Sequence, residues 1–193
     1  MRNGMVERKT AETDIRLKLE LDGKGKANVK TGVGFFDHML ISFAKHAQCD
    51  LDLQCEGDLC VDAHHTVEDC GIALGKAFAE AIGDKAGIAR YATQFVPMDE
   101  VLVMASLDVS GRAYLAYNVE FTVSRTGDFD AQLAEEFFRA FAMNAGVTLH
   151  INLMYGINTH HIIEAMFKAV ARAVREAAGA SGCEGVMSTK GVL

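Results

Sequence analysis

The residues of this chain that are best suited to chemistry are histidines and glutamates that share one motif. The pattern His-His-x-x-Glu occurs at residues 64–68 and again at residues 160–164. On a helix, the first His and the Glu lie one turn apart on the same face, so their side chains can reach one ion. The second His points about 100° further round the helix, toward a different ion. The motif therefore indicates metal binding by imidazole and carboxylate groups.

The repetition of the motif predicts two metal ions. A single copy is more simply explained as a helix cap or a solvated face, but recurrence at equivalent positions of a duplicated chain favours metal binding. With internal pseudo-symmetry, each ion can take the first His and the Glu of one motif and the second His of the other. One ion would then be held by His64, Glu68 and His161, and the other by His160, Glu164 and His65.

Each ion needs further ligands, and the helix that precedes each motif supplies candidates. His38 lies 26 residues before His64, and the corresponding helix of the second half contains Glu135 and Glu136. Glu136 is the better analogue of His38 because it too lies close to a pair of phenylalanines. The resulting set of imidazoles and carboxylates suits Mn, Fe or Zn, and it excludes a soft thiolate site.

The elements that must position the motifs are predicted to occur in the same order in both halves of the chain. In the first half, apolar residues alternate at period two and then recur at helical spacing. We expect a β-hairpin of strands 13–21 and 26–31 with a turn at 22–25, a helix at 34–47, a strand at 49–55 and a helix at 64–82.

The second half repeats this pattern. We expect a hairpin of strands 101–109 and 113–121 around Ser110-Gly111, a helix at 130–144, a strand at 147–155 and a helix at 159–178. Glycines and the single proline interrupt regular structure at residues 84–97. The prediction is an α+β fold in which a β-β-α-β-α unit is duplicated, with residues 1–90 and 91–193 forming two similar halves packed as one.

Composition excludes several classes of protein. The 193 residues carry a formal net charge of −7, without a Lys/Arg run and without Trp, so a nucleic-acid partner is not expected. No apolar run approaches the roughly 18 residues of a membrane span. The opening residues MRNGMVERKT are too charged for a secretory signal, so we expect a cytoplasmic protein with no membrane partner.

From residue type and position alone, the five cysteines and the two histidines His46 and His150 have structural explanations. Five cysteines without a C-x-x-C pair indicate neither a disulfide framework nor a cysteine zinc site, and buried thiols are the simpler interpretation. His150 alternates with apolar residues of a strand, which favours a structural or supporting role. His46 ends a helix, where a cationic side chain is favourable in any protein.

Several segments in the same order resemble the imidazoleglycerol-phosphate dehydratase family. The resemblance extends from Glu12 to Lys190 and rests on independent motifs. These are Phe36-Asp37-His38-Met39, Asp62-Ala63-His64-His65-Thr66-x-Glu68-Asp69, Ser110-Gly111-Arg112, Asn158-Thr159-His160-His161-x-x-Glu164-Ala165-x-Phe167-Lys168-Ala169 and the terminal Ser188-Thr189-Lys190-Gly191.

The resemblance implies a fold, a reaction and an assembly. The fold would be of the ribosomal protein S5 domain 2-like type, and the reaction would remove water from imidazole-glycerol phosphate to give imidazole-acetol phosphate in histidine biosynthesis. Two Mn²⁺ ions per subunit would hold the substrate imidazolate, with other divalent transition metals as alternatives. The subunits would form a homo-oligomer of twenty-four copies with sites at their interfaces.

The family's ligands can be transferred to matching residues. One ion would take His38, His65, His160 and Glu164, and the other would take His64, Glu68, His161 and the residue at position 136. The family often has His at position 136, and Glu136 here keeps a ligand but adds negative charge. Ala63 and Ala113 also depart from the family pattern, where Asp and Pro are common, without removing a ligand.

The reaction also needs proton transfer and a phosphate site. Because no carbonyl adjoins the carbon that loses its proton, the imidazole ring must act as the electron sink, and a general acid and base must assist. The candidates are Glu12, His46, Glu68 and Glu164. By resemblance, the phosphate would be bound by Arg90, Arg112, Lys168, Ser188, Thr189 and Lys190, with the C-terminal tail ordered over the substrate.

Two functions of other classes remain as alternatives. In a non-catalytic assembly protein, the paired His and Glu side chains would crosslink subunits through metal, and Arg90→Ala or Lys190→Ala would not affect function. In a dinuclear metallohydrolase, the two ions would activate water, and phosphate or amine would be released. Neither alternative explains Arg112 and the Ser-Thr-Lys tail together as well as the dehydratase does.

Overall fold

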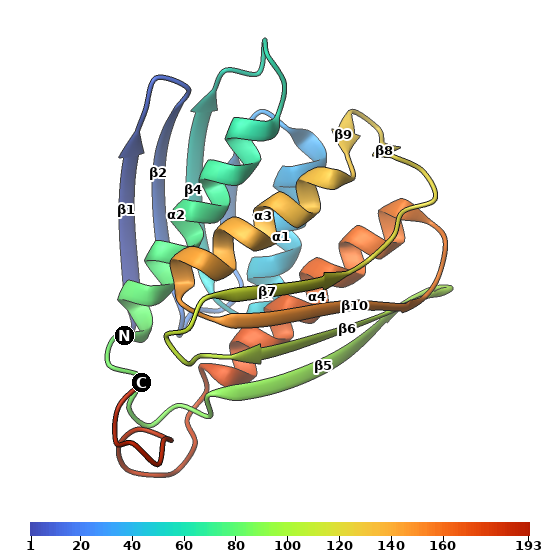
Figure 1. The fold of residues 1–193 in the computed structure, drawn as a ribbon. Helices are drawn as coiled ribbons and strands as arrows, with labels where there is room; N and C mark the ends of the chain where they lie inside the picture. The colour runs from blue at the N-terminus through green and yellow to red at the C-terminus, as the bar shows by residue number, and fades with distance from the viewer.

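The computed structural model describes residues 1–193, which form ten strands and four helices (Figure 1). The first half contains β1 (Asn3–Lys9), β2 (Thr13–Glu20), β3 (Ala27–Lys30), α1 (Gly34–Ala47), β4 (Asp50–Gly57) and α2 (His64–Ile82). The second half contains β5 (Tyr91–Met98), β6 (Val101–Asp108), β7 (Tyr114–Asn118), β8 (Arg125–Thr126), β9 (Phe129–Asp130), α3 (Gln132–Ala145), β10 (Thr148–Tyr155) and α4 (Thr159–Ala177). Apart from the small β8–β9 hairpin, the two halves have the same order, which confirms a duplicated α+β fold.

The prediction of hairpins at residues 13–31 and 101–121 is wrong. The sheet orders are β1-β2-β4-β3 and β5-β6-β10-β7, so a later strand lies between the two that were expected to pair. Residues 22–25 therefore form a crossing loop, in which the Asp50 carboxylate accepts hydrogen bonds from the backbone N–H groups of Lys24 (2.7 Å) and Lys26 (2.9 Å). Alternation of side chains identifies a strand, but it does not identify the strand's neighbour.

Each half begins with a strand that the sequence pattern did not single out. β1 and β5 pair antiparallel with β2 and β6 and form the hairpins of the fold. β5 contains Pro97, which the pattern places in the boundary between the halves. Proline is tolerated in β5 because this strand lies at the sheet edge. Each unit is therefore β-β-β-α-β-α, with one strand more than expected.

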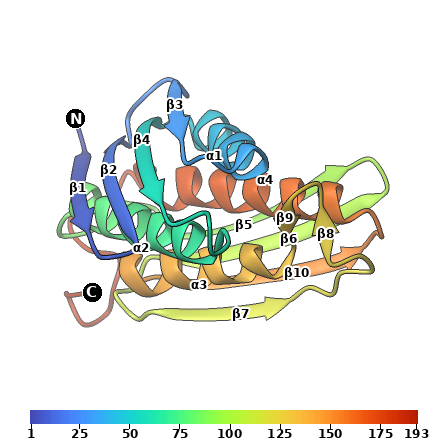
Figure 2. The same cartoon turned by 90° about the horizontal axis from the view of Figure 1, so that it is seen from above.

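The four helices lie at the centre of the molecule, and a sheet covers them on each side (Figures 1 and 2). α2 packs against α3 and α1 packs against α4, so helices from the two halves meet along the middle. Gly71 on α2 permits a close approach, because a Cβ there would lie 2.7 Å from the Phe137 carbonyl oxygen. One hydrophobic core of 53 buried residues extends through both halves.

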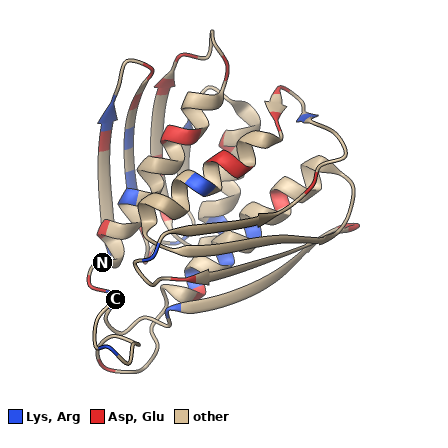
Figure 3. Ribbon diagram, viewed as in Figure 1, with Lys and Arg blue, Asp and Glu red and all other residues tan.

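The strands of the two sheets differ in their content of charged residues (Figure 3). The strands of the first sheet carry Lys, Arg, Asp and Glu at many positions, whereas Asp108 is the only such residue in the strands of the second sheet. Large apolar side chains are exposed on β5 and β7, including Tyr91 (51%), Phe95 (57%) and Tyr114 (58%). The second sheet therefore exposes large apolar side chains and carries almost no charge in its strands.

Three of the five cysteines are buried and two are not. Cys49, Cys55 and Cys70 lie in the interior, whereas Cys60 and Cys183 are exposed, so the expected burial is wrong for those two. Cys60 and Cys183 lie in irregular segments outside the helices and strands, where no neighbouring layer covers them. None of the four helices combines the length and apolar character that a membrane crossing requires.

Candidate metal centre and substrate site

The first histidine motif forms the first turn of α2. His64 and Glu68 lie side by side, with Nε2 and Oε2 3.9 Å apart. The His65 ring turns away: its Nδ1 lies 3.0 Å from Oδ2 of Asp58, which follows β4, and its Nε2 lies 3.6 Å from Oε1 of Glu12, which precedes β2. The hydrogen bond with Asp58 raises the pKa of His65, since it favours the charged ring. The two rings thus diverge, as consecutive helix positions require.

The second motif forms the first turn of α4 and repeats this arrangement. Nε2 of His160 lies 3.2 Å from Oε2 of Glu164. Nδ1 of His161 lies 2.9 Å from Oε2 of Glu100, and its Nε2 lies 3.6 Å from Oδ2 of Asp99. Both acids lie in the turn between β5 and β6. The hydrogen bond from His161 is the main reason that the pKa of Glu100 falls to about 2.

Glu164 connects the second motif to side chains of α1 and to a lysine on its own helix. Lys168 Nζ lies 2.7 Å from Glu164 Oε1. Burial would raise the pKa of Glu164, but hydrogen bonds from Lys168 and from the motif's first histidine, with the nearby His38, lower the pKa overall. Burial lowers the pKa of His46, and the positive charges of Lys168 and Arg172 add to the effect. Near pH 7, Glu164 is therefore ionised and His46 is neutral.

Glu136 has the same place in α3 that His38 has in α1. Each is the fifth residue of a 14-residue helix. α3 lies beside α2, with Phe137 against Gly71, and this register puts Glu136 at the same end of the helix pair as Glu68. The Glu136 side chain is partly exposed there.

A cleft of about 750 Å³ lies between the starts of α2 and α4. The loop that precedes α2, the start of α1 and the β8–β9 hairpin form its walls. His160 lines the cleft, and its ring packs edge-on against Phe35 with the ring centroids 5.1 Å apart. Elements of both halves therefore border the space next to the second motif.

Within one chain, the motif residues form pairs and do not form complete metal sites. No group of three or more His, Cys, Asp or Glu side chains is arranged to hold a metal ion. The exchange expected from pseudo-symmetry does not occur within the chain, because His65 and His161 face acids of their own halves.

The two arginines expected to bind phosphate, Arg90 and Arg112, meet at the carboxylate of Asp108. Arg90 donates through Nε to Asp108 (2.8 Å) and through Nη1 to the Met187 carbonyl (2.6 Å), and its guanidinium lies 4.5 Å from the Tyr91 ring centroid. Arg112 lies 3.4 Å from Asp108. The Arg90 side chain is only 9% exposed, whereas that of Arg112 is 67% exposed. Arg90 is thus committed to holding the tail, while Arg112 projects into solvent.

The C-terminal tail lies beside these arginines. Ser188, Thr189 and Lys190 directly follow Met187, whose carbonyl is bound by Arg90. The end of the chain folds back over the turn that precedes Arg112, since a Cβ at Gly111 would lie 3.6 Å from the terminal carbonyl carbon of the chain. The arginines and the Ser-Thr-Lys segment therefore form one cationic region.

The cationic region and the second histidine motif lie at opposite ends of α4. His160 is in the first turn of the helix, whereas the backbone N–H of Arg90 donates to the carbonyl of Ala177, the last helical residue (2.8 Å). Seventeen residues of helix separate the two ends by roughly 25 Å. A small molecule cannot touch both ends in one chain. Lys168 lies between them and is paired with Glu164 instead of belonging to the cationic region.

Sequence reasoning missed three acids that contact the motifs, namely Asp58, Asp99 and Glu100. Glu100 could have been found, because it directly precedes β6 as Glu12 directly precedes β2. Asp58 has no acidic counterpart, since the residue after β10 is Gly156. Its contact with the motif could only be known from the fold.

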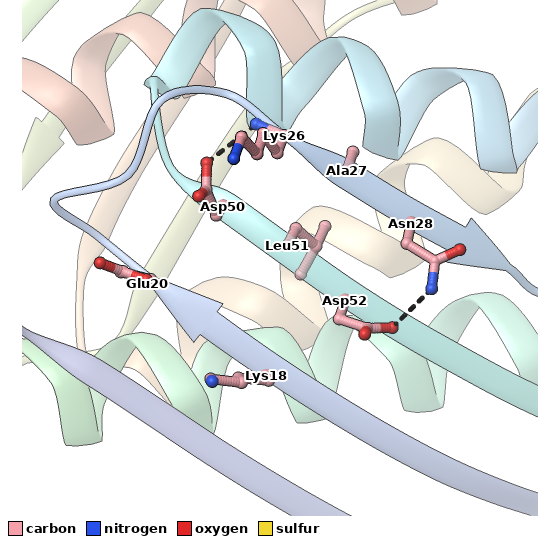
Figure 4. Close-up of a pocket in the computed structure, with 8 residues that line it drawn as sticks. All are labelled: Lys18, Glu20, Lys26, Ala27, Asn28, Asp50, Leu51 and Asp52. Carbon is pink, nitrogen blue, oxygen red and sulfur yellow. Dashed lines mark hydrogen bonds between the residues drawn. The ribbon is translucent and has the colours of Figure 1, made fainter.

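A depression on the outer face of the first sheet lies apart from these side chains (Figure 4). Its polar groups are paired locally: Asn28 Nδ2 donates to Asp52 (3.1 Å), and Asp50 accepts from the backbone of Lys26 (2.9 Å). None of the expected site residues lines it.

Comparison with known proteins connects this architecture to one family. The family model described as imidazoleglycerol-phosphate dehydratase matches residues 31–174. The imidazoleglycerol-phosphate dehydratase of Acetivibrio thermocellus is 58% identical over 189 residues, which are 97% of each chain. That of Caldanaerobacter subterraneus subsp. tengcongensis is 57% identical and covers 100% of both chains.

Solved structures show the same similarity. The crystal structure of imidazoleglycerol-phosphate dehydratase from Staphylococcus aureus has a TM-score of 0.85 and 40% identity, and the match covers 93% of this chain and 99% of that one. The enzyme from Pyrococcus furiosus, solved in complex with (S)-C348, has a TM-score of 0.85 and 37% identity, over 97% and 100% of the chains. This chain therefore belongs to the imidazoleglycerol-phosphate dehydratase family, hydro-lyases of histidine biosynthesis.

Proposed function

We propose that this chain converts imidazole-glycerol phosphate to imidazole-acetol phosphate with two divalent metal ions, taken to be Mn²⁺, per subunit. The observation that carries the proposal is the pair of His and Glu side chains that occurs in equivalent positions at the first turns of α2 and α4. Imidazole nitrogen and carboxylate oxygen together suit Mn²⁺, with Fe²⁺ or Zn²⁺ as alternatives.

Eight side chains would hold the two ions. Side chains of α1 and α4 would supply three ligands for one ion, and side chains of α2 and α3 would supply three for the other, with the second His of each motif completing the sets. When bound, the ions supply positive charge that draws electrons from the substrate's imidazole ring. The ligands would be His38, His65, His160 and Glu164 for one ion, and His64, Glu68, Glu136 and His161 for the other.

The chain's own side chains would move the protons. A base must collect the proton from carbon, and an acid must protonate the leaving hydroxyl. The lowered pKa of His46 leaves its ring neutral and able to accept a proton near pH 7. The lowered pKa of Glu164 keeps that carboxylate ionised beside Lys168. Glu12 and Glu68 complete the set of acid and base candidates.

The cationic region would bind the substrate's phosphate. Arg112 and Lys190 offer exposed charges, and Ser188 and Thr189 offer hydroxyl donors. Arg90 contributes by holding the tail through the Met187 carbonyl.

A complete site would combine residues from several copies of the chain. The ends of α4 are too far apart for one substrate to reach the second motif and the cationic region of the same chain. The outer face of the second sheet supports assembly, because its strands contain Asp108 as their only charged residue and copies that each carry a net charge of −7 can approach there while burying little charge. We propose a homo-oligomer of twenty-four copies in the cytoplasm, with a phosphorylated imidazole as its small-molecule partner and without a nucleic-acid or membrane partner.

The first experiment is turnover of imidazole-glycerol phosphate by metal-stripped protein before and after Mn²⁺ is added back. The proposal predicts that imidazole-acetol phosphate appears only with metal. Glu68→Gln should lower both bound metal and turnover, whereas Glu7→Gln, on the outer face of β1, should lower neither. Release of phosphate would indicate a hydrolase, and metal-dependent assembly without turnover would indicate an assembly protein.

A second experiment tests whether the site is shared. His161→Ala and Lys190→Ala should each abolish turnover, since one removes a metal ligand and the other a phosphate contact. When the two variants are unfolded, mixed and refolded together, some sites combine an intact motif from one chain with an intact tail from another. Partial recovery of turnover is expected in the mixture and not in either variant refolded alone. Absence of recovery would contradict a shared site.

A further inference from the structure

The second histidine of each motif is held by a carboxylate on one particular ring nitrogen. Nδ1 of His65 lies 3.0 Å from Oδ2 and 3.2 Å from Oδ1 of Asp58, and Nδ1 of His161 lies 2.9 Å from Oε2 of Glu100. An ionised carboxylate can only accept hydrogen bonds, so Nδ1 must carry the proton in the neutral ring. The lone pair of each neutral ring is then on Nε2.

The first histidine of each motif lacks this arrangement. The carboxylates that face the His64 and His160 rings are those of Glu68 and Glu164, and they face Nε2 at 3.9 Å and 3.2 Å. Neither ring has a carboxylate at Nδ1. The constraint on Nδ1 therefore applies to the second histidine alone, in both halves of the chain.

The two carboxylates are themselves held in place, and by different means. Glu100 accepts the backbone N–H of Asn158 through Oε1 (2.9 Å) while Oε2 faces His161, so one side chain spans the start of α4. Asp58 is fixed through its backbone, whose N–H donates to the carbonyl of Glu12 (3.0 Å). The same ring arrangement thus arises from residues that are not equivalent in the two halves. Duplication alone would place equivalent residues behind the two rings, whereas a requirement for a carboxylate at Nδ1 can be met by residues that are not equivalent.

We propose that Asp58 and Glu100 are positioning residues that fix the Nδ1–H tautomer of His65 and His161, so that each ring presents Nε2 to a metal ion. The metal part rests on the function proposed above, whereas the tautomer follows from the contacts of this chain. A carboxylate behind a histidine orients the ring and increases the basicity of the opposite nitrogen, and its loss costs about 10- to 100-fold in metal affinity.

The test reads the tautomer directly, without metal or substrate. Magic-angle-spinning NMR of metal-free, ¹⁵N-histidine-labelled protein at about pH 9, well above the usual histidine pKa of about 6.5, should show Nδ1–H for both rings. Asp58→Ala should remove this tautomer at His65 only, and Glu100→Ala at His161 only. Asp99→Ala is the matched control, because Asp99 faces Nε2 of His161 at 3.6 Å, and it should leave Nδ1 protonated.

Metal titration supplies the second readout. Mn²⁺ affinity, followed by electron paramagnetic resonance, should fall about 10- to 100-fold in Asp58→Ala and Glu100→Ala, and Asp58→Asn should recover part of the loss because its amide oxygen can still accept from Nδ1. Nε2–H rings in the unmutated protein, or variants with unchanged tautomer and affinity, would overturn the proposal. Nδ1–H rings in a protein that binds no Mn²⁺ would refute the metal site and the presentation of Nε2 to metal, while the tautomer assignment would stand.

Discussion

Replacement of Arg90 by Met is expected to destabilise the fold and release the C-terminal tail. The substitution keeps an apolar stem but removes two hydrogen bonds to Asp108 and one to the Met187 carbonyl. Hydrogen bonds from charged groups contribute about 1.5–3 kcal/mol, and breaking a buried ion pair costs about 3–5 kcal/mol. Asp108 remains 17% exposed and keeps Arg112 at 3.4 Å, so we expect the lower end, about 3 kcal/mol.

The matched control is Arg112→Met, whose side chain is 67% exposed and whose ion pair with Asp108 is longer. A surface pair of this kind is worth about 0–1 kcal/mol. Urea unfolding of both variants at one protomer concentration measures the difference, which corresponds to a fall in melting temperature of about 6–12 °C for Arg90→Met. Trypsin cleavage after Lys190 should become about 10- to 100-fold faster in Arg90→Met, because the tail loses its anchor to the body of the protein.

Equal effects of the two variants, within about 0.5 kcal/mol, would refute the reasoning. They would mean that the contacts of Arg90 contribute no more than an exposed pair. Destabilisation of Arg90→Met without faster cleavage would show that the tail is held by other contacts, such as the backbone hydrogen bond from Gly87 to Gly185.

Three further predictions concern packing, titration and reactivity. Gly71→Ala should lower the free energy of unfolding by about 1–3 kcal/mol because its Cβ would meet a backbone oxygen of α3, whereas Gly34→Ala, with no atom within 4 Å, should be neutral or stabilising; urea unfolding decides. NMR titration should give His46 a pKa below its usual value of about 6.5, and a midpoint at or above that value would contradict the burial argument. Because His46 then takes up its proton at a higher pH in the unfolded chain than in the folded one, this group should destabilise the protein as the pH falls below about 6.5. Burial raises the pKa of Cys49 to about 12, so iodoacetamide should alkylate Cys60 and spare Cys49 in the native protein, as mass spectrometry can show.

The helices were the most predictable part of the fold. Residues 34–47 and 64–82 form helices with the predicted bounds, and the other two helices differ by at most two residues at either end. Apolar spacing is a local property that a helix satisfies by itself, so the chain sequence is sufficient to locate it. Strand pairing depends on distant residues, and for that reason both predicted hairpins were wrong although most of the strands were found.

The site shows the same division. The spacing of each motif placed one His beside the Glu and turned the next His away, and the structure agrees for both motifs. The acids that receive the second histidines come from the end of β4, seven residues before His65, and from the β5–β6 turn, 61 residues before His161. Only the fold brings Glu100 to His161, and the role of Arg90 as a tail anchor depends in the same way on the distant residue Met187.

The sequence by itself determined the helices and the pairs of imidazole and carboxylate, because these depend on residues within a few turns of one another, and it showed the duplication because the same local motif occurs twice. The tertiary structure alone decided the strand order, the carboxylates behind His65 and His161 and the separation of the motifs from the cationic region. These features depend on which surfaces the core brings together, and the interior packs segments from both halves into one cluster. The length of α4 then keeps the two ends of the site apart within each chain.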